Sequence, residues 1–265
     1  MEHTLTVVFG PYWPILLFVL FGGSALAGLW GRKKRQAIVA RNTADARQHG
    51  MDYVPPSGGG GLQGTHRFCG TTRGVAWTAE VELLSAEVDD GMATRSHVSV
   101  HYTRWTAPEV GTGGGALLLM ALADGVRPQP AKANPGGFFG GLMAKAALAA
   151  FQVYIRSNFG NARGNSLSIS PENHLPLAAD AFGLAFTAFG DRPELFQRLS
   201  PSARDWLLKG CNGKTAFLWD QQGLSLTWPN ARIAPEEVAA CADYGAVLAS
   251  LLGVTALAPD VGATP

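Results

Sequence analysis

The feature that most constrains this chain is an uncharged apolar stretch near its N-terminus, followed directly by a cluster of positive charge. No Asp, Glu, Lys or Arg occurs from His3 to Gly31, and the sequence Gly-Arg-Lys-Lys-Arg occupies 31–35. A helix needs about 20 predominantly apolar residues to cross the bilayer core. We therefore expect residues 11–30 to form a transmembrane helix, preceded by a short N-terminus at 1–10.

A cleaved signal peptide is the competing interpretation of this stretch. Signal peptides carry positive charge before the apolar run and small residues at a cleavage site after it. Here Glu2 and His3 precede the run and the basic cluster follows it, which favours an uncleaved anchor. The positive-inside rule then places the basic flank and the remaining chain in the cytoplasm, with the N-terminus outside. The basic run is interpreted as a topological signal, and a specific anionic-lipid site is the alternative.

Small residues recur at four-residue spacing inside the predicted span. Gly23 precedes Ala27, and Ser24 precedes Gly28, at this spacing. Such patterns allow two membrane helices to approach closely. The expected partners are therefore the lipid bilayer and, through Gly23, Ala27 and Gly28, a second copy or another membrane protein.

Composition limits the rest of the chain to one sizeable domain or two small ones. Of 265 residues, 47% are hydrophobic and 15% charged, which suits a folded domain with a membrane segment. The net charge of +1 combines −1 in residues 1–30, +5 in residues 31–50 and −3 in the remainder. A mildly acidic domain is a poor nucleic-acid binder, so no nucleic-acid partner is expected.

Residues 31–64 are predicted to be a basic flank and a linker. Residues 36–48 contain good helix formers and could prolong the membrane helix. Gly50, the prolines at 55–56 and the glycines at 58–61 then break it, because such residues favour a flexible tether.

Alternation of apolar and polar residues predicts a mostly antiparallel β domain at 65–253. In 75–84, for example, Val75, Trp77, Ala79 and Val81 alternate with polar or small residues, the period of a half-buried strand. The predicted strands lie at 66–70, 75–84, 96–105, 116–123, 181–189, 215–219 and 224–228.

Packed helices complete the predicted α+β fold. A helix starts at Pro201, and a closing helix begins at Pro235 and ends before Gly253. The apolar segment 137–159 has helical spacing, and we rank a helix packed on the domain first, a helix on the membrane surface second and a second span last. Residues 254–265 are expected to be a flexible tail.

The His and Cys residues of the sequence suggest two kinds of reactive site, a metal site and a cysteine nucleophile. His97 and His101 share a strand face but lie about 13 Å apart, too far for one zinc ion, and a site at His66 and Cys69 would need further ligands. The one nucleophile hypothesis is Cys69, near a hairpin turn, with a histidine from the next strands as its base.

The remaining candidate residues have simpler explanations. Glu80 and Glu82 share a strand face and are interpreted as solvated, while Cys211 and Cys241 are interpreted as packing residues. The three cysteines form no paired motif and fit reduced cytoplasmic thiols. No residue is assigned a catalytic, cofactor-binding or metal-binding role, and no cofactor is expected.

Two segments carry a resemblance to a known group of proteins. The sequences Phe-Cys-Gly-Thr-Thr-Arg-Gly-Val-Ala-Trp at 68–77 and Leu-Ala-Phe-Thr-Ala-Phe-Gly-Asp at 184–191, with Leu-Ser-Pro at 199–201, resemble bacterial single-pass membrane-anchored proteins of unknown function. The resemblance implies a bacterial inner (plasma) membrane location and no catalytic residues.

The expected function is a membrane-anchored cytoplasmic interaction or scaffold module without catalytic activity. The alternative is a peripheral lipid- or ligand-binding domain that uses the apolar helix at 137–159. A cysteine-dependent enzyme ranks third.

Overall fold

The computed structural model describes residues 13–56, 64–89, 95–122, 138–160, 163–164, 167, 169–210, 215–229 and 234–253. Within these ranges, the backbone alone is described for residues 13–29, 31, 83–89, 95–101, 138–144 and 147. The predicted N-terminus at 1–10 and tail at 254–265 lie outside the described residues.

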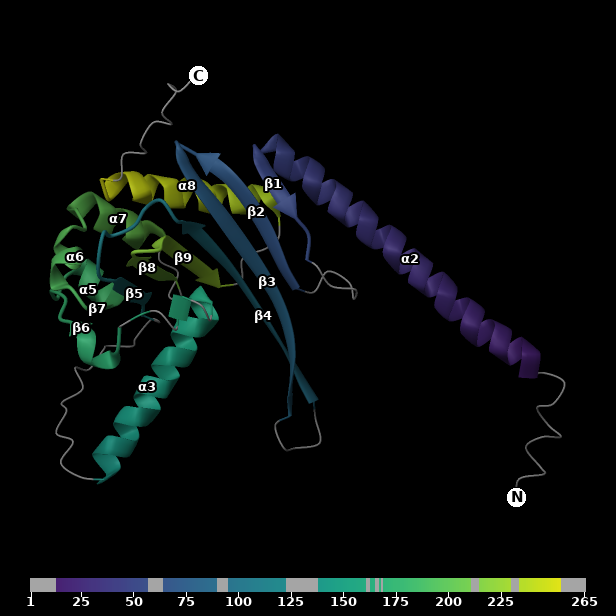
Figure 1. Cartoon of the computed structure of the whole chain (residues 1–265), viewed down its shortest axis with the longest axis horizontal. Coiled ribbons are helices and arrows are strands. Elements are labelled where there is room, and N and C mark those ends of the chain that lie inside the picture. The colour runs from purple at the N-terminus through teal and green to yellow at the C-terminus, as the bar shows by residue number, and fades with distance from the viewer. Residues whose placement is uncertain are drawn as a thin grey trace, which may run out of the picture.

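The described chain folds around a nine-stranded sheet in which every neighbouring pair of strands is antiparallel (Figure 1). The strand order is β1-β2-β3-β4-β9-β8-β5-β7-β6. The bounds are β1 Met51–Val54, β2 Gly64–Thr72, β3 Val75–Asp89, β4 Arg95–Ala107, β5 Leu117–Ala121, β6 His174–Leu175, β7 Phe186–Gly190, β8 Ala216–Asp220 and β9 Gly223–Pro229.

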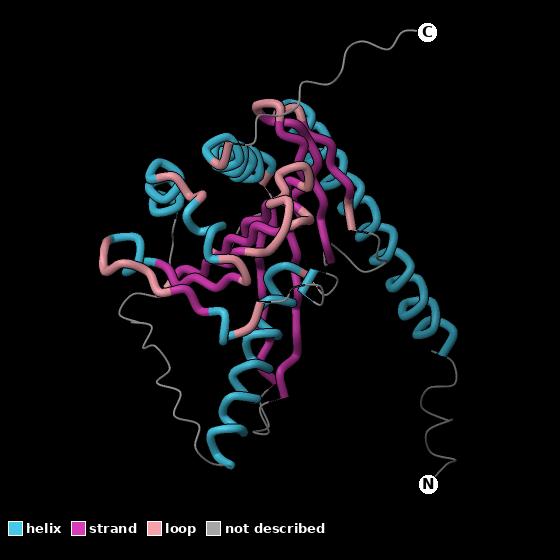
Figure 2. Tube along the Cα trace, turned by 60° about the vertical axis from the view of Figure 1, so that its left-hand side comes forward, coloured by secondary structure: helices cyan, strands magenta, loops and turns pink. Residues whose placement is uncertain are grey.

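Helices lie on both faces of this sheet (Figures 1 and 2). They are α2 Trp13–Gln48, α3 Phe138–Phe159, the 3-10 helix η1 Pro171–Asn173, α5 Ala181–Ala185, α6 Pro193–Gln197, α7 Pro201–Gly210 and α8 Pro235–Leu251. The predicted α+β fold with an antiparallel sheet, packed helices and a C-terminal helix is confirmed.

The main core lies between one sheet face and helices α7 and α8. Phe68, Trp105 and Trp219 are fully buried there, with Leu207 of α7 and Leu248 of α8 packed into the same cluster. On the opposite sheet face, the last turns of α3 form a second, smaller core. The two cores make the β5–β8 region a three-layered structure.

The predicted strand patterns match the observed register in the first half of the sheet. Strands β2 and β3 pair from Thr72↔Val75 to Gly64↔Leu83, and Val75, Trp77, Ala79 and Val81 are all buried. The apolar positions of the alternation therefore face the main core, as expected for a half-covered antiparallel sheet.

Helix α2 continues without a break into the residues predicted as the basic flank. It spans 36 residues, and Ala46 near its end is fully buried in the main core. The range 31–64 is therefore not simply a linker, because residues 51–54 form β1 and pair with β2. Met51 and Tyr53 are buried, so the folded domain begins before residue 65.

The segment at 181–189 was predicted as one strand, and this prediction is wrong for its first half. Residues 181–185 form α5, and the strand β7 starts only at Phe186. Asp180 caps α5, because its carboxylate accepts a hydrogen bond from the Gly183 backbone N–H at 2.9 Å. A capping Asp stabilises the first helical turn, and the apolar content alone did not distinguish this turn from a strand.

Among the residues described, no helix has both the length and the apolar character required to cross a membrane. The side chains of residues 13–29 lie outside the described part of the chain. The anchor at 11–30, with its small residues Gly23, Ala27 and Gly28, stays a prediction.

Candidate functional site

A charged row crosses three neighbouring strands on the sheet face opposite the main core. Glu80 of β3 lies between Arg67 of β2 and Arg104 of β4 in the strand register. Its two carboxylate oxygens accept hydrogen bonds from Arg67 at 2.8 Å and from Arg104 at 2.5 Å. Burial alone would raise the pKa of Glu80, but the hydrogen bonds and charges of Arg104 and Arg67 outweigh it and hold that pKa below its usual value.

The neighbouring carboxylate, Glu82, has a separate partner. Tyr102 of β4 lies directly opposite Glu82 and donates a hydrogen bond to it. Glu80 and Glu82 are therefore not a solvated pair of free carboxylates, as the sequence suggested, because both are held by cross-strand partners. We call this surface, formed by Arg67, Glu80, Glu82, Tyr102 and Arg104, the polar sheet face.

Next to the polar sheet face, Cys69 lies in an open hollow of about 680 Å³ at the ends of β1, β2 and β3. The lining includes Arg47, Asp52 and Thr78. The Thr78 hydroxyl lies 3.9 Å from the Cys69 sulfur. The hollow is open and its wall carries both an acidic and a basic side chain.

His66 lies on the other face of the same strand. Along β2, His66 and Phe68 are fully buried in the main core, whereas Arg67 and Cys69 point away from it. The His66 ring nitrogen Nδ1 and the Tyr53 hydroxyl share a hydrogen bond of 2.7 Å. Because alternate residues face opposite sides of a strand, His66 cannot act as a base for Cys69 or share a metal ion with it.

The other sequence candidates divide between placed and unplaced residues. The side chains of His97 and His101, and the whole of Cys211, lie outside the described residues. Burial, and to a smaller extent the charge of Glu237, raises the pKa of the Cys241 thiol to about 11, as expected for a packing residue. Among the described side chains, no three of His, Cys, Asp and Glu cluster as metal ligands would.

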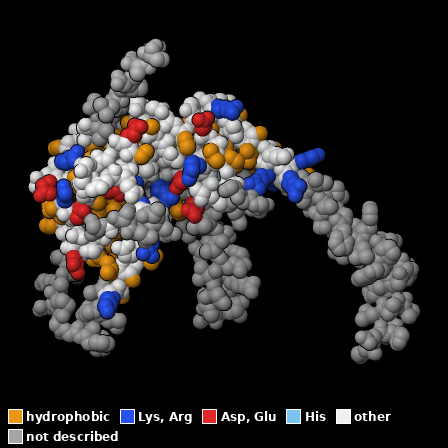
Figure 3. Space-filling view, viewed as in Figure 1, with side chains coloured by type: hydrophobic (Ala, Val, Ile, Leu, Met, Phe, Trp, Pro, Cys, Tyr) orange, Lys and Arg blue, Asp and Glu red, His pale blue; other side chains and the backbone are white. Residues whose placement is uncertain are grey.

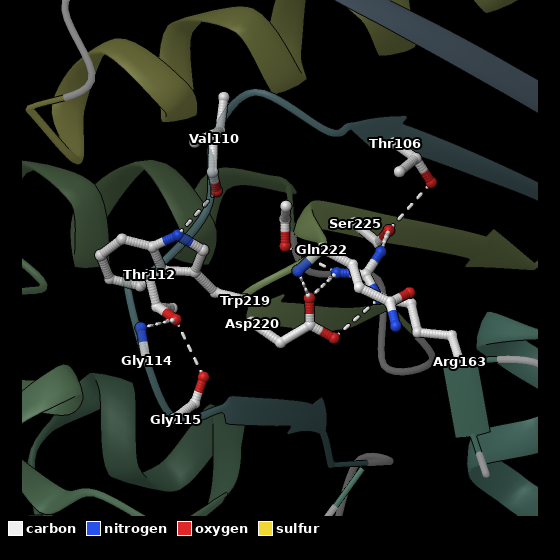
Figure 4. A network of polar contacts seen from close by, with 11 residues as sticks. Thr106, Val110, Thr112, Gly114, Gly115, Arg163, Trp219, Asp220, Gln222 and Ser225 are labelled. Carbon is white, nitrogen blue, oxygen red and sulfur yellow. Dashed lines mark hydrogen bonds and ion pairs between the residues drawn. The ribbon is translucent and has the colours of Figure 1, made fainter. Parts of the chain in front are cut away.

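A buried ion pair that the sequence analysis did not identify connects the segment after α3 to the β8–β9 hairpin (Figure 4). Arg163 binds both carboxylate oxygens of Asp220, at 2.8 and 2.6 Å, and also donates to the Gly223 carbonyl at 2.6 Å and to the Ser225 hydroxyl. Arg163 is 8% exposed and Asp220 5%. We call this network, completed by the Gln222 N–H on Asp220, the Arg163 clamp.

The Arg163 clamp could not be predicted from the sequence, because Arg163 and Asp220 are 57 residues apart. The only local signal is Asp220 at the start of the tight turn to Gly223, a position where Asp commonly accepts a backbone hydrogen bond. The clamp lies next to the second core, so it fixes the end of α3 against the sheet. Its buried groups are fully engaged with one another, which indicates a structural role.

Among its described side chains, helix α3 packs on the domain through those of its C-terminal turns. Phe151, Ile155 and Phe159 are buried in the second core, which confirms the first-ranked interpretation for this part of the segment 137–159. On the solvent side, Leu148 is 41% and Val153 64% exposed. The N-terminal half of the helix projects away from the sheet (Figure 1).

On the face of the molecule that Figure 3 shows, neither positive nor negative charge dominates. Basic side chains occur along the described part of α2, whereas acidic and basic side chains alternate over the sheet domain. Comparison of the chain with protein families, with curated proteins and with solved structures finds no match in any of the three.

Proposed function

We propose that this chain is a membrane-anchored interaction module: a non-catalytic α+β domain held at the cytoplasmic side of a bacterial inner membrane and recruiting a protein partner. The observation that supports this most directly is the continuity of α2. The helix runs from Trp13, inside the predicted anchor, to Gln48. An uninterrupted helix connects the predicted membrane span to the folded domain without a flexible joint.

The end of α2 is held in the domain by packing and by a polar contact. Ala46 is fully buried and Val39 packs against the main core. Arg35, within the basic cluster, donates a hydrogen bond to the Pro56 carbonyl at 2.9 Å. These contacts support a domain held at a fixed, short distance from the predicted span, because only about four residues at about 1.5 Å each, or about 6 Å, separate Arg35 in the basic cluster from Val39 on the main core.

The non-catalytic part of the proposal rests on how the reactive side chains are engaged. Glu80 and Glu82 are held by cross-strand partners, and Cys241 is kept as a neutral thiol by burial. Cys69 and His66 lie on opposite sides of the sheet. These arrangements suit a stable binding surface better than a site that must transfer protons.

Membrane fractionation followed by crosslinking tests the proposal. The full-length protein should stay in membranes washed at alkaline pH, and affinity purification after crosslinking should recover a protein partner in stoichiometric amount. A matched variant replaces Arg32, Lys33, Lys34 and Arg35 with Gln, which removes the topological signal and leaves the apolar run intact. Its domain should lose the fixed cytoplasmic orientation in a protease-protection assay.

Release of the unmodified protein by the alkaline wash would contradict the anchor. Retention without any recovered protein partner would contradict the interaction role and leave only the anchor. The two parts of the proposal therefore fail independently.

A second function, lipid binding through α3, is favoured by the exposed apolar side chains Leu148 and Val153. A fragment starting at Arg32 keeps Arg35 and Ala46 and so retains the packing of α2. If α3 binds lipid, this fragment should sediment with anionic vesicles, and L148E/V153E should abolish sedimentation. The control S157E places a negative charge at an exposed polar position of the same helix and should leave sedimentation unchanged.

A further inference from the structure

Trp30 lies where α2 leaves the predicted membrane span, and its side chain is uncovered. It is the last residue of the predicted span and the first of α2 whose side chain the structure describes. Trp is highly buried on average in folded proteins, yet Trp30 is 72% exposed. Amphipathic rings of this kind gather at the headgroup level of a bilayer. Trp30 therefore marks that level on α2.

Three basic side chains at the start of the described part of α2 have no acidic neighbour on the helix. Arg32, Lys33 and Lys34 are all exposed, and Figure 3 shows basic side chains protruding from this part of α2. Asp45 is the only acid among the 36 residues of α2, and it pairs with Arg41 at 3.5 Å. Side chains interact along a helix over three or four residues, so the Asp45 carboxylate does not reach the three cations.

Lys34 and Trp30 lie side by side. They are four residues apart, a spacing that places two side chains on the same face of a helix. The Lys34 Nζ lies 6.0 Å from the centroid of the Trp30 ring, at the outer limit of a cation–π contact. Together they present an apolar surface and a positive charge at one level of the helix, which matches the headgroup region of a lipid bilayer.

Arg35, the last member of the basic cluster, has a different role. It donates a hydrogen bond to the Pro56 carbonyl at 2.9 Å, and one turn further along α2 Val39 packs against the main core. At 3.6 residues per turn, Val39 lies on the opposite side of the helix from Trp30 and Lys34. The side of α2 that carries Trp30 and Lys34 therefore faces away from the domain.

The three exposed cations lie close to the level that Trp30 marks. At about 1.5 Å per residue, Arg32, Lys33 and Lys34 follow Trp30 by about 3–6 Å along the helix. Electrostatic interactions between exposed charges decay over about 8 Å at physiological ionic strength. Arg41, about 16 Å beyond Trp30, lies outside this range.

We propose that Arg32, Lys33 and Lys34, together with Trp30, form a binding site for the headgroups of anionic phospholipids. The inference rests on the proposed membrane anchor and adds a lipid preference to it. Basic residues next to a membrane span increase the affinity for an anionic leaflet by about fivefold for each residue. We call these four residues the headgroup site.

The position of the headgroup site favours a lipid over an acidic protein as its occupant. Helix α2 is continuous across the end of the predicted span, so the cations adjoin the bilayer itself. Three cations without an acid are complementary in charge to the anionic inner leaflet. An acidic protein would have to bind within about 6 Å of the headgroups, where the lipids compete with it for the same cations.

Native mass spectrometry of the full-length protein tests the lipid preference. The protein is released from nanodiscs that contain phosphatidylglycerol and phosphatidylcholine in equal amounts, and the retained lipids are counted. The unmodified protein should retain phosphatidylglycerol in preference, and K33Q/K34Q should reduce this preference by about 25-fold, from about fivefold for each charge. The matched control R41Q/R47Q removes the same charge from the same helix and should leave the preference unchanged. Absence of a preference in the unmodified protein, or an equal loss in the two variants, would overturn the headgroup site.

Zero-length crosslinking in native membranes tests the alternative occupant. A carbodiimide joins a Lys amine to a carboxylate in contact with it, and phosphatidylglycerol has no carboxylate. The proteins crosslinked to K33Q/K34Q should therefore be the same as those crosslinked to the unmodified chain. A protein that is crosslinked to the unmodified chain and lost in K33Q/K34Q would overturn the lipid as the occupant.

Protease protection and alkaline washing separate the headgroup site from the anchor. K33Q/K34Q keeps Arg32 and Arg35, so its domain should keep the cytoplasmic orientation. Inversion of the domain in this variant would show that the two charges act as a topological signal, and it would overturn the site. Release of the unmodified protein by the alkaline wash refutes the anchor and the headgroup site with it, whereas retention without a lipid preference refutes the headgroup site alone.

Discussion

The Arg163 clamp allows a sharp test of how this fold is stabilised. Replacing Arg163 with Met removes the guanidinium but keeps much of the apolar stem, and it leaves the Asp220 carboxylate buried without its cationic partner. Breaking a buried ion pair in this way costs about 3–5 kcal/mol. This is a large part of the about 5–15 kcal/mol by which domains are stable. Each kcal/mol shifts the unfolding temperature by about 2–4 °C at this chain length, so R163M should lower it by about 6–20 °C.

A double-mutant cycle separates the free-energy cost of leaving one buried charge unpaired from the net contribution of the Arg163–Asp220 ion pair to stability. D220N keeps the side-chain oxygen that accepts the Gln222 N–H but removes the negative charge, and it should also destabilise the fold. The single variant D220L, which closes the cycle, leaves Arg163 buried without its anionic partner and should destabilise the fold as R163M does. R163M/D220L removes both buried charges and should recover much of the loss, because such replacements are often neutral or stabilising. S225A is the matched control, since it removes one hydroxyl of the network and should cost about 1 kcal/mol.

Urea denaturation, followed by circular dichroism, measures these free energies of unfolding. Limited proteolysis gives a local measure, because cleavage in α3 should accelerate in R163M if the clamp fixes the end of that helix. The argument would be refuted if R163M cost less than about 1 kcal/mol, or if the effects of R163M and D220L simply added.

Three further predictions follow from the packing and the titrating groups. E80Q should destabilise the fold at neutral pH and have less effect in acid. The arginine partners lower the pKa of Glu80 in the folded state, so the contribution of this carboxylate to the free energy of unfolding is present above the unfolded pKa of about 4.3 and is lost as pH falls through the folded pKa. Urea titrations at several pH values measure this, and an effect of E80Q that did not change with pH would contradict it. G245A should lower stability by about 1–3 kcal/mol, because a Cβ there would lie 2.7 Å from the Trp105 ring; a thermal shift equal to that of the exposed change A240S would count against this packing. Finally, folding raises the pKa of the Cys241 thiol from 9.0 to about 11, so the contribution of this thiol to the free energy of unfolding is complete below pH 9.0 and is lost between pH 9.0 and about 11. C241A should flatten the dependence of that free energy on pH in this range. An unchanged pH dependence would show that the thiol does not titrate there.

The local elements of this fold were predictable where one strand face or one helix boundary dominates the pattern. The strands at 215–219 and 224–228 were predicted, the second from the alternation of Leu224 and Leu226 with polar residues, and the structure confirms both and pairs them as a hairpin that closes at Asp220↔Gly223. Helix α8 begins at Pro235, as its helix-start residues indicated. These predictions succeed because burial of one face and the chemistry of helix starts act over a few residues.

Long-range pairing and partner choice were not predictable in the same way. The neighbour of β4 is β9, more than 100 residues later in the chain, and no local pattern specifies that pairing. Strand β1 was missed because prolines and glycines surround it, although Met51 and Tyr53 alternate with exposed residues. The metal hypothesis for His66 and Cys69 failed for a simpler reason: an odd spacing on one strand places the two residues on opposite faces.

The order of apolar and polar residues along each strand depends on whether one or both faces of that strand are covered. Strands β5 and β8, with α3 on one face and the main core on the other, read as continuous apolar runs, and all five residues of β8 are buried. Strand β3 alternates where only one face is covered.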